Sequence, residues 1–371
     1  MPKDKILKKV VEKKKKKKKK GFLSNLIKEV AGNTLHPLQR FSPKNCLSMG
    51  VLNFDLVLGG GLRRSRMYML YGPSSASKST TIINAIMEAQ KKSIPVIHQD
   101  YEKASDKDYI NTLGFYPETF VLEDGDPGYY YMVPTTGEGG YKALFKILRK
   151  LPDIDQWVEG PPTILIVIDS YMSMESEKVT DEKNPMGVKA LMHSTYQGRL
   201  RSLCLSKGAC ILATNQLRMS PMSFGSPITI PCGEAIKFYA DAIVEMWRRK
   251  EKPQGDENVS MVIFRNKVKN RMSKPYLSCE VPLIIGKGFD KDYDRLEFLV
   301  AMGEIEKNRG KYLIEEKSLN LGAAKRLMKK PEWIKKALKI SRSKEYYLKF
   351  WGKKEKTKEV DLSDVVLDEK G

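Results

Sequence analysis

Residues 67–80 read MYMLYGPSSASKST, and this stretch decides the fold. The apolar run Met67–Tyr71 is typical of a buried strand, and a helix is expected over Lys78–Lys92. The loop between them, Gly72–Ser77, would turn its backbone N–H groups toward an anion at the N-terminus of that helix. The succession of strand, loop and helix therefore predicts a phosphate-binding loop.

This loop follows the pattern G-x-x-x-x-G-K-S/T except at one position. We expect Lys78 to reach the outer phosphate oxygens of a nucleotide and the hydroxyl of Ser79 to ligate Mg²⁺. Ser77 stands where the pattern has glycine, so a serine must adopt a backbone conformation that is easy for glycine. A Ser-rich turn that binds nothing is the alternative. The residues expected to bind the nucleotide here are Gly72, Pro73, Ser74, Ser75, Ala76, Ser77, Lys78, Ser79 and Thr80.

Acidic residues follow two further strand-like runs. Asp169 ends the run Leu165–Ile168, where a carboxylate can hold Mg²⁺ together with Ser79. Asp100 and Glu102 follow another run, and hydrolysis of a terminal phosphate needs a group that orients and deprotonates water. Both acids are of the right type, and the residues alone do not choose between them. They are equally compatible with ordinary loop acids.

Strands and helices alternate along the middle of the chain. Strands are expected at Ile94–His98, Thr119–Leu122, Thr163–Ile168 and Ala209–Thr214, and helices at Lys107–Leu113, Tyr141–Leu151 and Val188–Ser206. Such alternation predicts an α/β fold, with a mostly parallel twisted sheet and helices on both faces. An antiparallel extension is expected from the strands Ala242–Arg248, Val259–Phe264 and Tyr276–Leu283. A small C-terminal α/β unit should end in the helices Leu321–Lys330 and Glu332–Ile340.

The net charge of +21 is concentrated at the two ends of the chain. Residues 1–20 carry +10 and residues 325–371 carry +7, whereas the remaining 304 residues carry only +4. Basic ends on a nearly balanced body suit the steering of a polyanion, and nucleic acid is the obvious candidate. The run Lys13–Lys20 is equally compatible with a solvated tail that aids solubility.

Composition excludes several classes of protein. A hydrophobic content of 41% in 371 residues excludes global disorder, and no apolar run reaches the ~18 residues that span a bilayer. The five cysteines are odd in number and form no C-x-x-C pair, which argues against a disulfide framework and a zinc ribbon. We therefore expect a reducing, cytoplasm-like compartment, no secretory signal and no membrane partner.

Further motifs accompany the phosphate-binding loop in a fixed order. They are LGGGL (58–62), DYEKA (100–104), IDS (168–170), NQLRM (215–219), CGEAIKFY (232–239), KNR (269–271) and GKG (286–288). From about Cys46 to about Gly310 the chain thereby resembles the RecA family of recombinases, and particularly the phage recombinases of the UvsX type.

The resemblance implies roles for individual residues around the nucleotide. Glu102 would be the catalytic carboxylate that activates water, and Gln216 would sense the γ-phosphate. Asp106 and Tyr109 would bind adenine. Lys269 and Arg271 match two basic residues that reach the ATP of the adjacent protomer, although a solvated strand end is the alternative for them. Phe238 would pack at the same interface, or else in the core.

The resemblance also implies two DNA-binding loops, Ser173–Gly187 and Arg218–Gly233. Apolar side chains between base steps would hold DNA stretched, although they are equally compatible with local packing. The residues expected to bind DNA are Met186, Gly187, Arg218, Met219, Phe224, Gly233 and Lys237.

The function implied by the resemblance is that of an ATP-dependent strand-exchange protein of homologous recombination and repair, stimulated by single-stranded DNA. It would use ATP and Mg²⁺ and bind single- and double-stranded DNA as a helical filament of identical copies. It would act in the cytoplasm, or in a host cytoplasm if phage-encoded. A RecA-like helicase or branch-migration motor, and an ATP-gated DNA-binding protein without catalysis, remain alternatives.

Composition and this resemblance together divide the chain into five parts. We expect a disordered Lys-rich tail (1–20), an N-terminal helix and oligomerisation segment (21–45), a RecA-like P-loop ATPase core (46–289), a small C-terminal domain (290–350) and a flexible charged tail (351–371).

Overall fold

The computed structural model describes residues 42–154, 160–177, 185–219, 228–254, 257–344 and 347. All of them belong to one compact unit, Phe41–Gly371. The expected tails at 1–20 and 351–371, and almost all of the segment 21–45, lie outside the described residues. The boundaries of the five expected parts therefore stay predictions.

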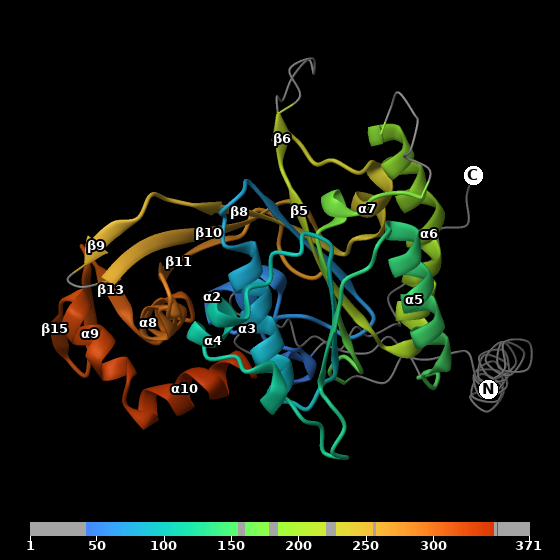
Figure 1. Ribbon diagram of the computed structural model, residues 1–371. Helices are drawn as coiled ribbons and strands as arrows, with labels where there is room; N and C mark the ends of the chain where they lie inside the picture. The colour runs from blue at the N-terminus through green and yellow to red at the C-terminus, as the bar shows by residue number, and fades with distance from the viewer. Residues whose placement is uncertain are drawn as a thin grey trace, which may run out of the picture. The chain divides into compact units, whose positions relative to one another are not determined.

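A parallel sheet forms the centre of this unit (Figure 1). Among the described residues, six parallel strands stand in the spatial order β8-β1-β5-β4-β2-β3. They are β1 (Met67–Gly72), β2 (Val96–Asp100), β3 (Tyr129–Met132), β4 (Leu165–Asp169), β5 (Cys210–Gln216) and β8 (Ala242–Arg248). Gly72 is aligned with Gln216, and Asp100 with Asp169. The carboxyl ends of four strands thus meet along one edge of the sheet.

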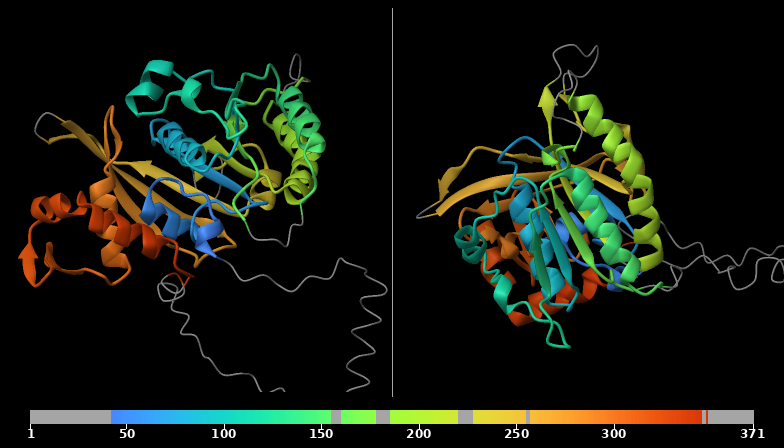
Figure 2. Two further views of the ribbon diagram at one scale, coloured as in Figure 1. Left: turned by 90° about the horizontal axis from the view of Figure 1, so that it is seen from below. Right: turned by 45° about the vertical axis from the view of Figure 1, so that its right-hand side comes forward.

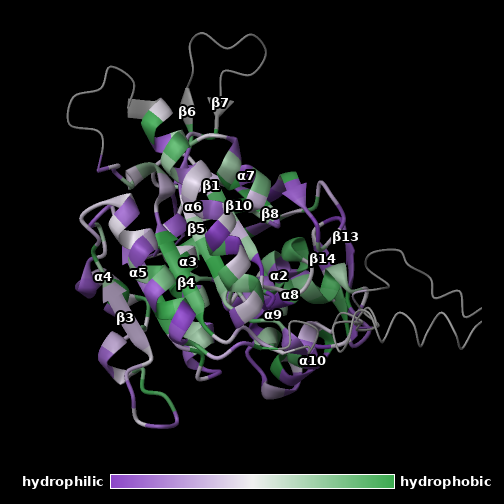
Figure 3. Ribbon diagram, turned by 90° about the vertical axis from the view of Figure 1, so that its right-hand side faces the viewer, coloured by the Kyte–Doolittle hydropathy of each residue, from purple (hydrophilic) through white to green (hydrophobic). Residues whose placement is uncertain are grey.

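Helices cover both faces of the sheet, as a buried parallel sheet requires. The helices are α2 (Leu52–Leu58), α3 (Lys78–Gln90), α4 (Lys107–Thr112), α5 (Gly137–Lys150) and α6 (Pro185–Lys207). In Figure 1, α5 and α6 lie together on one side of β5, and α2 and α3 lie on the other. The central strands β4 and β5 are mainly hydrophobic in Figure 3, and their apolar side chains are shared between the two resulting cores.

The antiparallel extension is also confirmed. β8 pairs with β10, β10 pairs with β11 and β9, and β11 pairs with β12, all antiparallel. Their bounds are β9 (Lys252–Gln254), β10 (Glu257–Asn270), β11 (Ser278–Ile284) and β12 (Gly288–Phe289). β10 runs beyond the predicted Val259–Phe264, and its pairing with β8 shifts register between Arg265 and Lys269. The extra residues bring the end of β10 next to the start of β8.

A smaller α/β region follows the sheet in sequence and packs against its antiparallel end (Figure 2). It contains α8 (Lys291–Ala301), β13 (Glu306–Asn308), β14 (Lys311–Ile314), β15 (Lys317–Leu319), α9 (Leu321–Met328) and α10 (Pro331–Ser341). The three strands form an antiparallel sheet, and the helices close a separate apolar core around Phe298 and Trp333. The expected fold class, an α/β core with a mostly parallel sheet, an antiparallel extension and a small α/β addition, is confirmed.

Short elements connect these parts. They are the 3-10 helices η2 (Pro43–Asn45), η3 (Pro117–Thr119) and η4 (Tyr171–Ser173), the helix α7 (Glu234–Tyr239), and the paired strands β6 (Arg218–Met219) and β7 (Ile228–Thr229). The expected strand Thr119–Leu122 is wrong, because Pro117 starts a 3-10 turn and Val121 forms only an isolated bridge to Pro127. The edge strand lies at β3 instead.

The expectations about membrane-spanning segments and cysteines can be compared with the described residues. Within the described ranges, no helix combines the length and the apolar character needed to cross a bilayer. All five cysteines lie in the part of the chain that is described, and none of them forms a disulfide there.

One buried acid, Asp55, ties the segment before α2 to that helix. Its carboxylate accepts hydrogen bonds from the backbone N–H of Met49 (2.8 Å) and the hydroxyl of Ser48 (2.5 Å). Burial raises the pKa of Asp55 from 3.8 to about 7 despite these two hydrogen bonds. The folded state therefore keeps a proton that the unfolded chain loses, and the contribution of Asp55 to stability falls as the pH rises from about 4 to about 7.

The variant Asp55→Asn should remove this pH-dependent loss. Urea unfolding at several pH values should show the free energy of unfolding of the variant gaining on the wild type between pH 5 and pH 8, because the amide stays neutral. Asp124→Asn, which changes an exposed carboxylate, is the control and should leave the pH profile unchanged. A constant difference between Asp55→Asn and wild type over this range would contradict the assignment.

Candidate nucleotide site and its surroundings

The loop that the sequence predicts to bind phosphate joins β1 to α3, as expected. Its first residue, Gly72, lies so close to β8 that an added Cβ would stand 2.2 Å from the carbonyl oxygen of Met246. Only glycine fits there without moving backbone. The first turn of α3 receives no hydrogen bond from a capping side chain. Its N–H groups are therefore directed at the loop, as at other anion-binding helix ends.

Lys78, the first residue of α3, is buried beneath the loop. Its ammonium group donates hydrogen bonds to the carbonyl oxygens of Gly72 (3.2 Å) and Pro73 (2.8 Å). Burial lowers the pKa of Lys78, while the nearby carboxylates of Asp169 and Glu102 oppose that shift. A cation that is desolvated in this way gains from an anion placed in the loop.

Ser77 adopts the left-handed conformation that the pattern assigns to glycine, with φ at 66° and ψ at 27°. This conformation disfavours residues with a Cβ. In addition, its hydroxyl oxygen is buried and has no hydrogen-bond partner among the described residues. Ser77 therefore lowers the stability of the folded loop, and a glycine at this position would not.

Ser79 and Asp169 lie side by side, from α3 and the end of β4. The hydroxyl of Ser79 donates to Oδ2 of Asp169 at 3.2 Å, and the hydroxyl of Thr214 on β5 donates to Oδ1. Burial raises the pKa of Asp169 to about 6, which means that the buried carboxylate lacks compensating positive charge. Hard oxygen ligands and an undercompensated negative charge fit Mg²⁺.

Glu102 follows β2 and reaches the neighbouring strand ends. Its Oε1 accepts hydrogen bonds from the hydroxyl of Ser170 (2.7 Å), the hydroxyl of Ser173 (3.2 Å) and the side-chain amide of Gln216 (3.0 Å). Its backbone is held by Asp169, whose carbonyl oxygen accepts from the N–H of Glu102 at 3.4 Å. Oε2 enters none of the hydrogen bonds between described residues, so one carboxylate oxygen is open to solvent or substrate.

Asp100 is arranged differently. It is buried, and it accepts from the backbone N–H groups of Lys103 (2.8 Å) and Ser105 (3.0 Å) and from the hydroxyl of Tyr131 (2.9 Å). Burial alone would raise the pKa of Asp100, but the hydrogen bonds from Ser105 and Tyr131 lower it overall. Asp100 is thus occupied in holding the loop that carries Glu102.

The two expected adenine ligands lie at the start of α4. Asp106 is the N-cap, and its Oδ1 accepts from the N–H groups of Asp108 (2.8 Å) and Tyr109 (3.3 Å). The hydroxyl of Tyr109 is 2.5 Å from that of Thr80, and 39% of this tyrosine is exposed. The ring of Tyr109 is therefore tied to the first turn of α3.

A hollow of about 340 Å³ lies on the other side of the loop. It is lined by Pro73–Ala76 and by Arg248–Glu251, which follow β8. Its basic side chains add positive charge next to the phosphate-binding loop.

The residues expected to bind DNA come from segments that adjoin one another. In Figures 1 and 3, β6, β7 and the beginning of α6 lie at the same end of the sheet. Gly233, at the N-terminus of α7, packs against α6, since an added Cβ would stand 2.9 Å from the Cβ of Ala190. The thiol of Cys232 donates to the carbonyl oxygen of Tyr171 at 3.5 Å. The end of the second expected DNA-binding loop thus contacts residues on either side of the first, Tyr171 before it and Ala190 after it.

The other DNA candidates lie in three elements, and one of them is not described. Met186 and Gly187 lie in α6, and Arg218 and Met219 in β6. Lys237 lies in α7 and pairs with Glu234. Phe224 lies outside the described residues.

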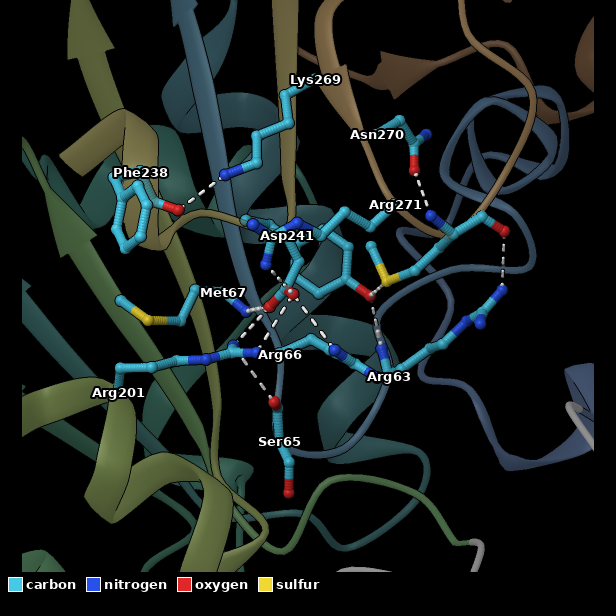
Figure 4. A network of polar contacts seen from close by, with 12 residues as sticks. Arg63, Ser65, Arg66, Met67, Arg201, Phe238, Asp241, Lys269, Asn270 and Arg271 are labelled. Carbon is cyan, nitrogen blue, oxygen red and sulfur yellow. Dashed lines mark hydrogen bonds and ion pairs between the residues drawn. The ribbon is translucent and has the colours of Figure 1, made fainter. Parts of the chain in front are cut away.

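Lys269 lies at the end of β10, next to α7, and Arg271 directly follows that strand (Figure 4). The ammonium group of Lys269 donates to the carbonyl oxygens of Lys237 (2.9 Å) and Phe238 (2.6 Å). Arg271 has 52% of its side chain exposed, and Nη1 stands 3.9 Å from Oδ1 of Asp241. Phe238 is 65% exposed, so it is not a core residue.

The sequence missed the residues that hold these groups in place. Ser170, Ser173 and Thr214 contact the two central acids. Ser170 belongs to the motif IDS (168–170) and Thr214 is a polar residue within an apolar strand, but neither pattern predicted these contacts. Asp241 and Arg201, which form a buried ion pair beside Arg271, come from segments 40 residues apart and follow no local motif.

Substitutions of Ser77 test whether its backbone strain and buried hydroxyl lower the stability of the protein. Ser77→Gly should raise the free energy of unfolding by about 1 kcal/mol, because it relieves the left-handed strain and removes a buried unpaired hydroxyl. Ser77→Ala removes only the hydroxyl, so urea unfolding without nucleotide should place it between wild type and Ser77→Gly. A Ser77→Gly protein less stable than wild type would show that serine is accommodated without strain.

Comparison with known proteins agrees with this geometry. Residues 23–290 match the RecA N-terminal domain family. The chain is similar to Protein RecA of Pseudomonas putida, with 29% identity over 298 residues that cover 77% of each chain. It is also similar to Protein RecA of Pseudomonas fluorescens (strain Pf0-1), with 29% identity over 311 residues, 80% of this chain and 82% of the relative. The region that matches the family contains the ends of β1, β2, β4 and β5, and the chain belongs to the RecA family of recombination and repair proteins.

Proposed function

We propose that the chain is an ATP-dependent strand-exchange protein that polymerises on single-stranded DNA and hydrolyses ATP when DNA is bound. One observation carries the proposal: the side-chain amide of Gln216 reaches Glu102 at 3.0 Å, while two residues later the backbone enters β6. A single residue thus connects a candidate catalytic acid with a candidate DNA-binding segment.

The phosphates of ATP would lie in the loop between β1 and α3. The N–H groups of the loop and of the first turn of α3 would bind phosphate oxygens, and Lys78 would turn from the carbonyl oxygens that it now contacts. Tyr109 would stack on adenine, and Asp106 would read its amino group with the carboxylate oxygen that does not cap α4. The hydrogen bond between Tyr109 and Thr80 would hold the adenine-binding ring at a fixed position relative to the phosphate-binding loop.

Ser79 and Asp169 would hold Mg²⁺ between them. When bound, the ion would offset the negative charge of the phosphates. Thr214 would fix the orientation of Asp169 by occupying the oxygen that faces β5.

Glu102 would activate the attacking water. Its Oε1 is fixed by Ser170, Ser173 and Gln216, so Oε2 would accept the proton of a water molecule in line with the γ-phosphate. Asp100 would support the loop, since three donors already occupy its carboxylate.

Gln216 would couple the presence of the γ-phosphate to the position of the expected DNA-binding segment. If its amide moved from Glu102 to a γ-phosphate oxygen, the end of β5 and the β6–β7 pair would move with it. Asn215 supports this route, because its side chain donates to the carbonyl oxygen of Pro231 at 3.1 Å, next to the end of the second expected DNA-binding loop.

Lys269 and Arg271 would act on the ATP of an adjoining copy. Lys269 lies at the end of β10 and Arg271 directly follows it, and the half-exposed guanidinium of Arg271 can reach an anion outside its own chain. Phe238, exposed beside them, would bury its ring at the same contact. The UvsX-type character and the role of the basic ends in steering DNA remain predictions from the sequence.

Glu102→Gln should bind ATP and DNA but hydrolyse ATP about 10²- to 10⁴-fold more slowly, because the variant lacks the proton acceptor. Asp100→Asn should lower turnover far less and mainly reduce stability. Steady-state ATP turnover with and without single-stranded DNA measures both effects, and Lys78→Ala gives the baseline without bound nucleotide. If a folded Asp100→Asn protein hydrolyses ATP more slowly than Glu102→Gln, then Asp100 is the catalytic acid and Glu102 is not.

A further inference from the structure

Asp241, which directly precedes β8, is a fully buried carboxylate bound by a fixed set of donors (Figure 4). Both guanidinium nitrogens of Arg201 donate to it, Nη1 to Oδ2 and Nη2 to Oδ1, the latter at 3.1 Å. The backbone N–H of Met67 donates to Oδ2 at 2.9 Å. A buried carboxylate held in this way by a bidentate arginine is well oriented.

Two further guanidinium groups approach the same carboxylate less closely. Nη1 of Arg66 donates to Oδ1 at 3.2 Å, and Nη1 of Arg271 stands 3.9 Å from Oδ1. The exposed fractions of the side chains rise in the same order, from 14% for Arg201 to 41% for Arg66 and 52% for Arg271. Arg271 is therefore oriented by Asp241 but not locked to it.

The cluster has more positive than negative charge. Three guanidinium groups surround one carboxylate, and the ammonium of Lys269 lies beside them. Burial lowers the pKa of Lys269, the charge of Arg271 lowers it further, and Asp241 opposes both. The least tightly held cation, Arg271, is the one that an anion from outside can draw away.

We propose that Asp241 is the positioning residue for Arg271. It holds the guanidinium of Arg271 at the end of β10 until that group binds the phosphates of the ATP in an adjoining copy. The inference rests on the proposed function, in which Arg271 acts on the neighbour's ATP. It adds a residue that follows no motif of the sequence.

The contacts around Asp241 keep the free-energy cost of moving Arg271 to the neighbouring copy small. When Arg271 leaves, Asp241 keeps Arg201, Arg66 and the N–H of Met67, so no buried charge is left unpaired. The backbone stays anchored as well, because the N–H of Arg271 donates to the carbonyl oxygen of Asp241 at 3.0 Å. The side chain can therefore move while the end of β10 stays in place.

A double-mutant cycle of the full chain tests the inference. Asp241→Asn should lower DNA-stimulated ATP turnover about tenfold, but it should lower it no further in an Arg271→Ala background. The affinity of the unassembled protein for ATP should be unchanged, since the loop between β1 and α3 is intact. Asp294→Asn is the matched control, because Asp294 is also buried and accepts backbone hydrogen bonds from Leu52 and Asn53. Its effect should be the same factor in both backgrounds.

The outcomes separate this inference from the function on which it rests. If Arg271→Ala is slow but folded Asp241→Asn turns over at the wild-type rate, the positioning role is wrong and the function stands. If Asp241→Asn lowers turnover by the same factor in both backgrounds, Asp241 is merely structural. If Arg271→Ala itself keeps full turnover, the role of Arg271 at the neighbour's ATP is wrong, and the inference is overturned with it.

Arg201→Gln provides a second test that needs no change at Asp241. Loss of the bidentate partner should leave Asp241 to draw Arg271 inward, so turnover should again fall several-fold in the wild-type background and not in the Arg271→Ala background. Full turnover of Arg201→Gln would overturn the inference even if Asp241→Asn does not fold.

Discussion

The alignment of parallel strand ends is the constraint on which the other features of this protein depend. β1, β2, β4 and β5 end along one edge, with Gly72 opposite Gln216 and Asp100 opposite Asp169. Parallel pairing fixes these matches, because a shift by one residue would turn every buried side chain to the opposite face. The apolar strands thus stabilise the fold, and their last residues supply the polar groups of the site.

Three buried carboxylates show how similar residues receive different tasks. Asp100 is satisfied by three neutral donors and supports a loop, whereas Asp169 lacks compensating charge and suits a cation. Asp241 is compensated by guanidinium groups that differ in how firmly they are held. The number and charge of the donors distinguish the three acids.

Much of the fold was predictable, because the apolar runs and the loop at Gly72–Ser77 carry local signals that the structure confirms. Lys78, Ser79 and Asp169 were predicted as site residues from their places at a helix start and a strand end, whereas Glu102 and Gln216 were predicted from the resemblance to the RecA family. The contacts of Glu102 with Ser170 and Ser173, and the cluster around Asp241, depend on tertiary packing and left no comparable signal. The expected strand at Thr119–Leu122 failed because the β propensity of a short segment did not outweigh Pro117.

The central claim is that ATP lies between two copies, with Glu102 supplied by one and Lys269 with Arg271 by the other. Mixing two inactive proteins, Glu102→Gln and the double variant Lys269→Ala, Arg271→Ala, on single-stranded DNA tests it most directly. Some interfaces in the mixture then combine an intact Glu102 with an intact basic pair, so ATP turnover should exceed the sum of the two proteins measured alone. Turnover equal to that sum, at concentrations where the two proteins form mixed polymers, would contradict the account.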